Sequence, residues 1–171
     1  MKRLIYVILI FFISCRATPG EEKVTAATIL GNPAYQAICY GGYRTTTLDV
    51  EPSVAEIKED MRLLAAMKIK VVRTYKVNRK EISNLLAAIT ELKKEDKDFE
   101  MYVMMGAWID CKNAWTSNPP VHTEESERNA SEIAEAVRLA NHYPDIVKII
   151  AVGNEAMVNW ATSYYVTPNF I

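Results

Sequence analysis

The hydrophobic positions of this chain alternate between short apolar runs and longer stretches with helical spacing. The apolar runs occupy residues 35–40, 70–75, 100–109 and 147–152. Their length and their β-branched or aromatic content are typical of strands buried on both faces. Between them, apolar residues recur every three or four positions, as they do in an amphipathic helix. The pattern therefore predicts a βαβαβαβ order of elements.

Two of the expected helices have boundary signals at their start. Ser53, with Glu56 three residues later, forms a capping-box pattern before a helix with apolar positions at residues 57, 61, 64 and 67. Asn78 and Glu81 repeat this spacing before a second helix with apolar positions between residues 82 and 92. We expect both helices to begin at these polar residues.

The third helix is expected over residues 129–142, with Pro144 beyond its end. Its spacing predicts that Ile133 and Val137, together with two alanines, face the core. Residues 110–125, before this helix, are predicted to form a polar loop. After the last strand, Thr167 and Pro168 indicate the start of another helix.

Two α/β architectures fit this order: a doubly wound parallel sheet and a (β/α) barrel. The first has little support, because no Gly-x-Gly-x-x-Gly follows the first strand. Polar or aromatic groups follow all four strands, at the end where barrel enzymes hold their chemistry. These residues are Tyr40, Arg73, Tyr75, Trp108, Asp110, Asn154 and Glu155. We therefore predict an α/β fold that is part of a (β/α)8 TIM barrel, a half-barrel of about four βα units.

Composition narrows the function classes. The 171 residues are 50% hydrophobic and carry a net charge of −1, so a packed domain is expected and no basic surplus indicates nucleic acid as a partner. Two histidines and three scattered cysteines show no metal-ligand spacing, and neither a metal nor a cofactor is expected. Cys39 and Cys111 fall in separate strand-end regions and are expected to remain unpaired.

The first 20 residues have the features of an export signal. Lys2 and Arg3 precede an apolar run over residues 4–13, which is too short to span a bilayer comfortably. Residues 12–15 resemble a loose bacterial lipobox, in which Cys15 carries the lipid; ordinary cleavage near Ala17 is the alternative. Either outcome predicts an exported protein, anchored in the cell envelope or secreted. Residues 21–34 form a polar lead-in, and residues 35–171 form the domain.

The strongest chemical signal lies in residues 147–160. The apolar run at 147–152 changes abruptly to Gly153, Asn154 and Glu155. A helix cap is one interpretation of this tripeptide, since Asn is a good cap. A site at the carboxyl end of the strand is the other, and the polar ends of the three preceding strands favour it.

Taken together, the strand ends resemble glycoside hydrolase family 17, whose members are retaining β-1,3-glucan-active enzymes of the (β/α)8 class. The resemblance extends over about residues 35–168. It rests on four motifs in the expected order: Tyr40-Gly41, Val72-Arg73-Thr74-Tyr75, Gly106-Ala107-Trp108 and Val152-Gly153-Asn154-Glu155. It implies β-glucan as the partner and hydrolysis or transfer of its glycosidic bonds as the activity.

The resemblance also implies roles for particular residues. Glu155 matches the family's acid/base carboxylate, and Asn154 matches the asparagine that contacts the sugar 2-hydroxyl. The predicted substrate-binding residues are Tyr40, Arg73, Tyr75, Trp108 and Trp115. The first three match strand-end positions of the family, whereas the two tryptophans are inferred from their apolar faces. An acid that protonates a leaving group is favoured by burial beside aromatic groups, so we expect such surroundings for Glu155.

The family's nucleophile is a glutamate on the seventh strand, and only four strands are predicted here. A retaining enzyme needs its second carboxylate roughly 5 Å from the first. Asp110 carries no mark of that role. We therefore expect a fragment that lacks its nucleophile. A non-catalytic carbohydrate-binding lipoprotein and an inactive barrel remnant are the alternatives, and open sheet edges also predict self-association.

Overall fold

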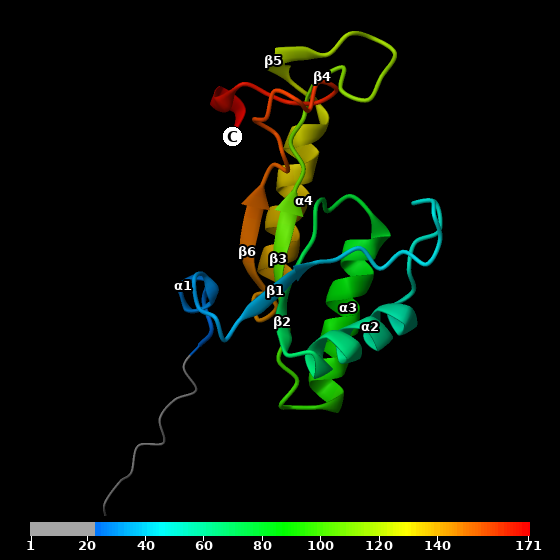
Figure 1. Cartoon of the computed structure of the whole chain (residues 1–171), viewed down its shortest axis with the longest axis vertical. Helices are drawn as coiled ribbons and strands as arrows, with labels where there is room; N and C mark the ends of the chain where they lie inside the picture. The colour runs from blue at the N-terminus through cyan, green and yellow to red at the C-terminus, as the bar shows by residue number, and fades with distance from the viewer. Residues whose placement is uncertain (1–22) are drawn as a thin grey trace, which may run out of the picture.

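The computed structural model describes residues 23–171, so the predicted export signal and Cys15 lie outside the described residues. A four-stranded parallel sheet organises this mixed α/β structure (Figure 1). The strands lie side by side in their chain order. They are β1 (Gln36–Cys39), β2 (Ile69–Arg73), β3 (Tyr102–Ala107) and β6 (Val147–Val152). All four predicted strands are confirmed, each within a few residues of its expected bounds.

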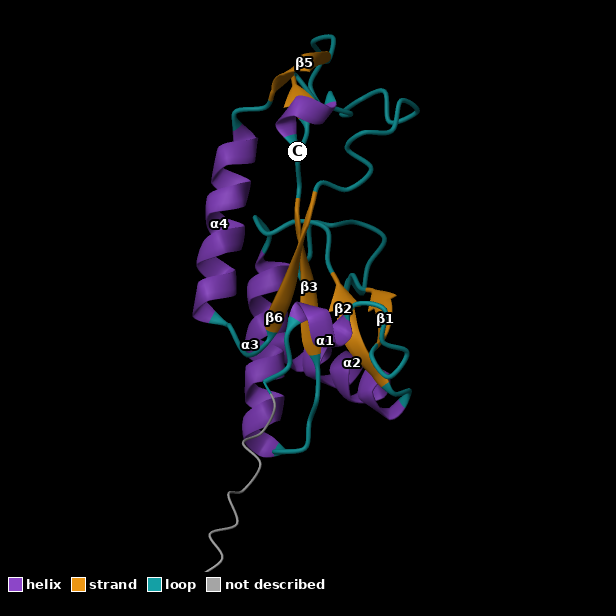
Figure 2. Ribbon diagram, turned by 90° about the vertical axis from the view of Figure 1, so that its left-hand side faces the viewer, coloured by secondary structure: helices purple, strands orange, loops and turns teal. Residues whose placement is uncertain are grey.

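Three helices connect the strands: α2 (Val54–Ala66), α3 (Lys80–Glu95) and α4 (Arg128–His142). Side chains from all three helices share one buried cluster with Val72 of β2, Val103 of β3 and Val147 of β6. The helices therefore cover the same face of the sheet (Figure 2). A doubly wound sheet would place helices on both faces.

The opposite face of the sheet carries a smaller cluster. Val71 of β2 and Tyr102 of β3 are buried there against Ile29, which belongs to the short helix α1 (Ala26–Ile29). This helix lies within the predicted polar lead-in. It covers only part of the face, and Arg73 and Asn154 meet beyond it.

The expectation that the strands are buried on both faces is wrong for the two outer strands. β1 is exposed along its whole length, and in β6 Ile150 and Val152 are 36% and 50% exposed. These two strands are exposed because they lie at the edges of the sheet, where each has a neighbouring strand on one side only. β2 and β3, which have neighbours on both sides, supply most of the buried strand residues of the core, and β6 adds Val147.

The predicted inner face of the third helix is also wrong. Ile133 and Val137 of α4 are 44% and 49% exposed. The helix instead buries Asn129, Glu132, Ala136 and Leu139. Asn129 and Glu132 are polar. They can be buried because Glu132 forms hydrogen bonds with two backbone N–H groups of the loops above the sheet, and Asn129 with the backbone of a third residue there. A pattern that counts only apolar residues assigns this helix to the wrong face.

The helix starts show one confirmed cap and one wrong one. Ser53 caps α2: its Oγ accepts a hydrogen bond from the Glu56 N–H, and the Glu56 carboxylate accepts one from the Ser53 N–H. Such a cap stabilises a helix by about 1 kcal/mol. α3 begins at Lys80 without a side-chain cap from Asn78. A carboxylate from another loop replaces it, since Glu51 Oε2 accepts the N–H of Glu81 at 3.0 Å.

The predicted loop at residues 110–125 contains two short antiparallel strands, β4 (Cys111–Lys112) and β5 (Val121–Glu125). They pack with the segment after β6, which ends in the 3-10 helix η1 (Pro168–Phe170), around a second apolar cluster. We call this unit, residues 109–125 and 156–171, the cap. It stands above the carboxyl ends of β3 and β6 (Figure 1). Among residues 23–171, no helix combines the length and apolar character needed to cross a membrane.

Candidate functional site at the carboxyl ends of the strands

Three of the predicted site residues meet above the exposed face of the sheet. Arg73 ends β2 and Asn154 follows β6, and the Nη2 of Arg73 donates to the Oδ1 of Asn154 at 3.0 Å. The Arg73 guanidinium also lies 5.1 Å from the centre of the Tyr75 ring. Strands β2 and β6 are separated by β3, so these side chains join elements that are not adjacent in the sheet. The guanidinium holds the Asn154 amide in one orientation.

Gly106 of β3 makes this arrangement possible. A Cβ at this position would lie 2.5 Å from the backbone oxygen of Thr74 and 2.5 Å from the carbonyl carbon of Tyr75. The chain after β2 therefore crosses directly against β3, and only glycine leaves it room. The Thr74 hydroxyl accepts the Gly106 N–H at 3.3 Å. This close crossing sets the direction of Tyr75, whose side chain is 38% exposed.

Glu155 lies at the turn after β6, in the left-handed region of backbone conformation with φ of 53°. Its Oε2 accepts a hydrogen bond from the Tyr164 hydroxyl at 2.8 Å. Burial, and then the nearby Glu155, raises the pKa of this tyrosine. Glu155 itself is exposed, so the expectation that it is buried is wrong, although it has the expected aromatic neighbour in Tyr164. A non-glycine residue in this conformation is uncommon and is found often at functional sites.

Tyr40 does not join this group. Its side chain is buried in the cluster under the helices, and its hydroxyl donates to Asp60 Oδ2 of α2 at 2.8 Å. Burial and Asp60 raise its pKa far above the ordinary tyrosine value. Gly42 accommodates this ring, since a Cβ there would lie 2.3 Å from the Tyr40 hydroxyl oxygen. The structure thus places Tyr40 in the packing of β1 against α2, and not beside Arg73 and Asn154.

Cys39, at the end of β1, borders the site and was not predicted to belong to it. The Tyr75 hydroxyl, and then the Arg73 guanidinium 3.9 Å from Sγ, lowers the pKa of this exposed thiol. Cys111 is fully buried, and burial raises the pKa of its thiol. Both cysteines are free in the described part of the chain.

We predict that iodoacetamide alkylates Cys39 far faster than Cys111 at pH 7.5, because the thiolate is the reactive form. Tyr75→Phe removes the largest cause of the lowered pKa and should shift the pH at which Cys39 reacts half-maximally upward. Peptide mapping by mass spectrometry against pH measures both rates. Lys97→Ala, an exposed change elsewhere on the surface, serves as the control. An unchanged pH profile in Tyr75→Phe would contradict the assignment.

The two predicted tryptophans form an aromatic cluster with Tyr164. Trp115 stacks on the Tyr164 ring, with centroids 4.9 Å apart and planes inclined by 23°. Trp108 lies 5.2 Å from the same ring. Because the Tyr164 hydroxyl also reaches Glu155, this tyrosine connects the tryptophans to the carboxyl. The loops after β3 and β6 are brought together here, at the junction between the cap and the sheet.

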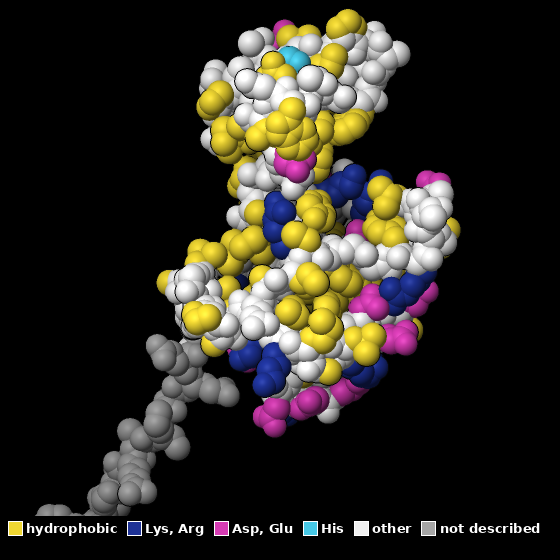
Figure 3. Space-filling view, in the orientation of Figure 1, with side chains coloured by type: hydrophobic (Ala, Val, Ile, Leu, Met, Phe, Trp, Pro, Cys, Tyr) yellow, Lys and Arg dark blue, Asp and Glu magenta, His cyan; other side chains and the backbone are white. Residues whose placement is uncertain are grey.

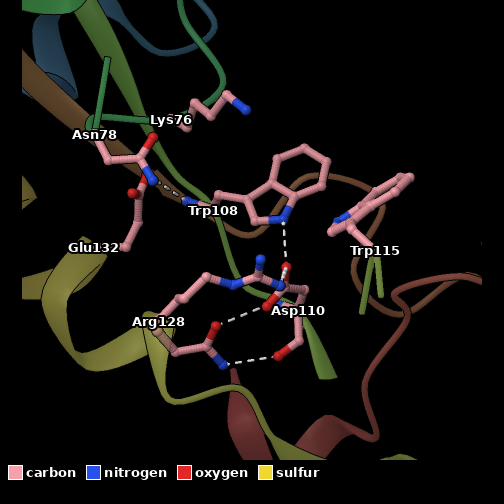
Figure 4. Close-up of a pocket in the computed structure, with 8 residues that line it drawn as sticks. Lys76, Asn78, Trp108, Asp110, Trp115, Arg128 and Glu132 are labelled. Carbon is pink, nitrogen blue, oxygen red and sulfur yellow. Dashed lines mark hydrogen bonds and ion pairs between the residues drawn. The ribbon is translucent and has the colours of Figure 1, made fainter. Parts of the chain in front are cut away.

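A pocket of about 450 Å³ opens beside the tryptophans (Figure 4). Its walls come from the loop after β2, the loop after β3 and the start of α4. The lining residues are Lys76, Asn78, Trp108, Asp110, Trp115, Arg128, Asn129 and Glu132. In the space-filling view the molecule narrows between cap and sheet, and charged side chains gather at this waist (Figure 3). Glu155 and Asn154 do not line the pocket, so it is separate from the group around Arg73.

Two buried carboxylates shape the pocket. Glu132 Oε1 accepts the N–H groups of Val77 at 2.7 Å and Trp108 at 3.2 Å, and so ties the loops after β2 and β3 to α4. Asp110 Oδ2 pairs with Arg128 Nη2 at 2.9 Å, while its Oδ1 is buried without a partner. Burial also lowers the pKa of Lys76, which lies 5.9 Å from the centre of the Trp108 ring.

Sequence reasoning missed several residues of this region. Tyr164, Glu132, Arg128 and Lys76 lie on segments predicted as tail, helix surface or loop. None of them carries a local signal: Glu132 and Glu135 both lie on the same amphipathic helix, and such acids usually face solvent. Among the described residues, no group of three or more histidine, cysteine or acidic side chains is placed to hold a metal ion.

Comparison with known proteins places this geometry in context. No family model matches the chain, and no curated protein matches it. A solved structure, that of an endo-laminarinase from Formosa Hel1_33_131, matches with 62% sequence identity and a TM-score of 0.85. The match covers 86% of this chain and 37% of the laminarinase chain. The chain is thus closely similar, over most of its length, to a little more than a third of that protein.

Proposed function

We propose that this chain is the N-terminal part of a retaining β-1,3-glucan hydrolase of the family 17 type, with Glu155 as its acid/base residue. The observation that carries the proposal is the 62% identity to an endo-laminarinase, which is high enough to indicate shared chemistry as well as shared fold. The strand-end residues add independent support, because Arg73 and Asn154 meet above one face of the sheet and Glu155 directly follows Asn154.

The architecture is consistent with half of a (β/α)8 barrel. A barrel winds its strands in chain order with every helix on the outer face, and β1, β2, β3 and β6 follow that order under α2, α3 and α4. The exposed outer strands β1 and β6 are then the edges at which further strands would close the barrel. The face that carries Arg73 and Asn154 is the interior of that barrel.

The chemistry follows from the positions of the polar groups. Glu155, exposed at the turn after β6, is free to reach a glycosidic oxygen, and the Tyr164 hydroxyl orients its carboxyl. Asn154, fixed by Arg73, is positioned to contact a sugar hydroxyl. The nucleophile, roughly 5 Å from Glu155 in a retaining enzyme, is proposed to come from a segment outside this sequence. We also propose that residues 1–20 act as an export signal, with Cys15 as the lipid attachment site, and that the activity belongs to the cell envelope or the outside of the cell.

A hybrid enzyme tests this proposal. This chain, substituted for the matching 37% of the endo-laminarinase, should give a protein that releases reducing sugar from a β-1,3-glucan. The intact laminarinase and the same hybrid with a β-1,4-glucan are the controls. A folded hybrid that binds the β-1,3-glucan without cleaving it would favour the non-catalytic carbohydrate-binding alternative. A folded hybrid that neither binds nor cleaves would contradict both functions.

A further inference from the structure

A hollow of about 730 Å³ lies at the amino ends of β3 and β6, at the opposite end of the sheet from Arg73 and Asn154. We call it the lysine hollow. Tyr102, the first residue of β3, lines it together with four lysines from the segment before α1, the end of α3 and the turn after it, and β6. These are Lys23, Lys93, Lys97 and Lys148. Segments far apart in the sequence thus bring positive charge to one place.

The four lysines have no carboxylate partner. Within residues 23–171, none of their ammonium groups forms an ion pair. Lys148 donates instead to a backbone oxygen, at 2.8 Å. Three acids also line the hollow, but Glu100 is paired with Lys70. The four lysines therefore have only Asp98 and Asp145 to balance them, and the hollow keeps a positive excess.

Two of the lysines are partly buried, which makes an unpaired charge costly. Lys93 and Lys148 lie over the Tyr102 ring, with their Nζ atoms 5.1 and 5.7 Å from its centre. Burial lowers the pKa of both ammonium groups, because it removes water from the charged form. An anion in the hollow would offset this cost through charge-assisted hydrogen bonds, and a phosphate group has several oxygens that can accept them.

The position of the lysine hollow in the chain indicates which anion it meets. Lys23 is the first described residue, and the proposed lipid attachment site, Cys15, precedes it by eight residues. Eight residues span at most about 28 Å when fully extended. A lipid on Cys15 would therefore keep the hollow close to the surface of the bilayer. The candidate site, at the carboxyl ends of the same strands, would then be directed away from the membrane.

We propose that the lysine hollow binds the phosphate head groups of an anionic lipid surface. The choice of occupant rests on the proposed export signal, and the positive excess of the hollow supports it. A lysine close to such a surface increases partitioning into it about fivefold. A lipid anchor alone limits the distance of the protein from the membrane. The lysine contact also fixes which side of the protein faces the membrane, and so leaves the carboxyl ends of the strands open to a polysaccharide.

Binding of the full chain to phospholipid vesicles tests the proposal, with sedimentation as the readout. The quantity measured is the partition coefficient for mixed phosphatidylglycerol and phosphatidylcholine vesicles, divided by that for phosphatidylcholine alone. This ratio isolates the contribution of charge, because the apolar run at residues 4–13 contributes to both. The double variant Lys93→Gln/Lys148→Gln should lower the ratio about 25-fold, since two lysines are removed.

A matched variant controls for net charge. Lys80→Gln/Lys112→Gln removes the same charge from the start of α3 and from the cap, at the other end of the molecule, and should leave the ratio nearly unchanged. Circular dichroism confirms that each variant is folded. Raised ionic strength should release the unaltered chain from the mixed vesicles, because salt screens the contact.

Each outcome decides the proposal. A ratio near one for the unaltered chain would overturn it, as would an unchanged ratio in Lys93→Gln/Lys148→Gln or an equal fall in both double variants. Release by inorganic phosphate at constant ionic strength would show that the hollow takes free phosphate, and would overturn the lipid surface as its occupant. A fall confined to Lys93→Gln/Lys148→Gln would support it. The hybrid enzyme is assayed without vesicles, so these results and the proposed hydrolysis are decided separately.

Discussion

Replacement of Glu155 by Gln in the hybrid enzyme is expected to lower kcat on a β-1,3-glucan by about two to four orders of magnitude. The amide has nearly the same shape as the carboxyl but cannot donate a proton to the departing oxygen, and general acid catalysis contributes about that much. Tyr164 keeps a hydrogen-bond acceptor in the variant, so the turn after β6 should be preserved. The measurement is steady-state release of reducing sugar.

A second substrate makes this test specific for an acid. An aryl β-glucoside with an acidic phenol needs no proton to leave, so its bond cleavage should suffer much less than that of the glucan. Glu59→Gln, an exposed change on α2, is the control and should retain full activity. Equal losses of kcat/KM, which reports the bond-cleavage step, on both substrates would show that Glu155 acts in some way other than as an acid.

The largest expected effect on stability belongs to Glu132. Replacing it with Ala should lower the free energy of unfolding by about 3 to 5 kcal/mol, because hydrogen bonds to a charged group contribute about 1.5 to 3 kcal/mol each. The N–H groups of Val77 and Trp108 would lose their acceptor inside the protein. Glu132→Gln keeps one oxygen in place and should cost about 1 to 2 kcal/mol. Urea unfolding followed by circular dichroism gives these values.

Glu135→Ala is the matched control on the same helix. Glu135 forms a surface ion pair with Arg138, and such pairs contribute less than about 1 kcal/mol. If both alanine variants lower the free energy of unfolding by similar amounts, the buried contacts of Glu132 stabilise the fold no more than a surface ion pair does. A large cost for Glu132→Ala would confirm that one side chain joins the loops after β2 and β3 to α4.

Much of the fold could be predicted from the sequence, because its strands and helix periods are local patterns. Ser53 and Glu56 show why: a cap depends on residues three positions apart, and the capping box forms as expected. Which face of α4 packs against the core could not be predicted, because the burial of Glu132 depends on hydrogen bonds with the backbone of loops that are distant in the sequence. The short strands β4 and β5 were missed because β4 has only two residues and β5 is mostly polar, so neither shows an apolar run.

The candidate site, like the fold, could be predicted from the sequence only in part. Arg73 and Asn154 could be expected to meet, because parallel strands deliver their carboxyl ends to one edge of a sheet. Tyr40 was misplaced because a position at a strand end does not reveal toward which face the side chain turns, and here it turns to Asp60. Tyr164 has no local signal at all, because its place beside Trp115 depends on how the two segments of the cap pack together.

The order of strands in the sheet bears on how the chain reaches this structure. Each strand pairs with the one that precedes it in the sequence, so β2 meets β1, β3 meets β2 and β6 meets β3. During synthesis on the ribosome, every new strand therefore finds its neighbour already made. The sheet can grow one βα unit at a time, but each parallel pairing joins residues that are 31 to 45 positions apart in the sequence, and such non-local pairing is slower than that of a hairpin.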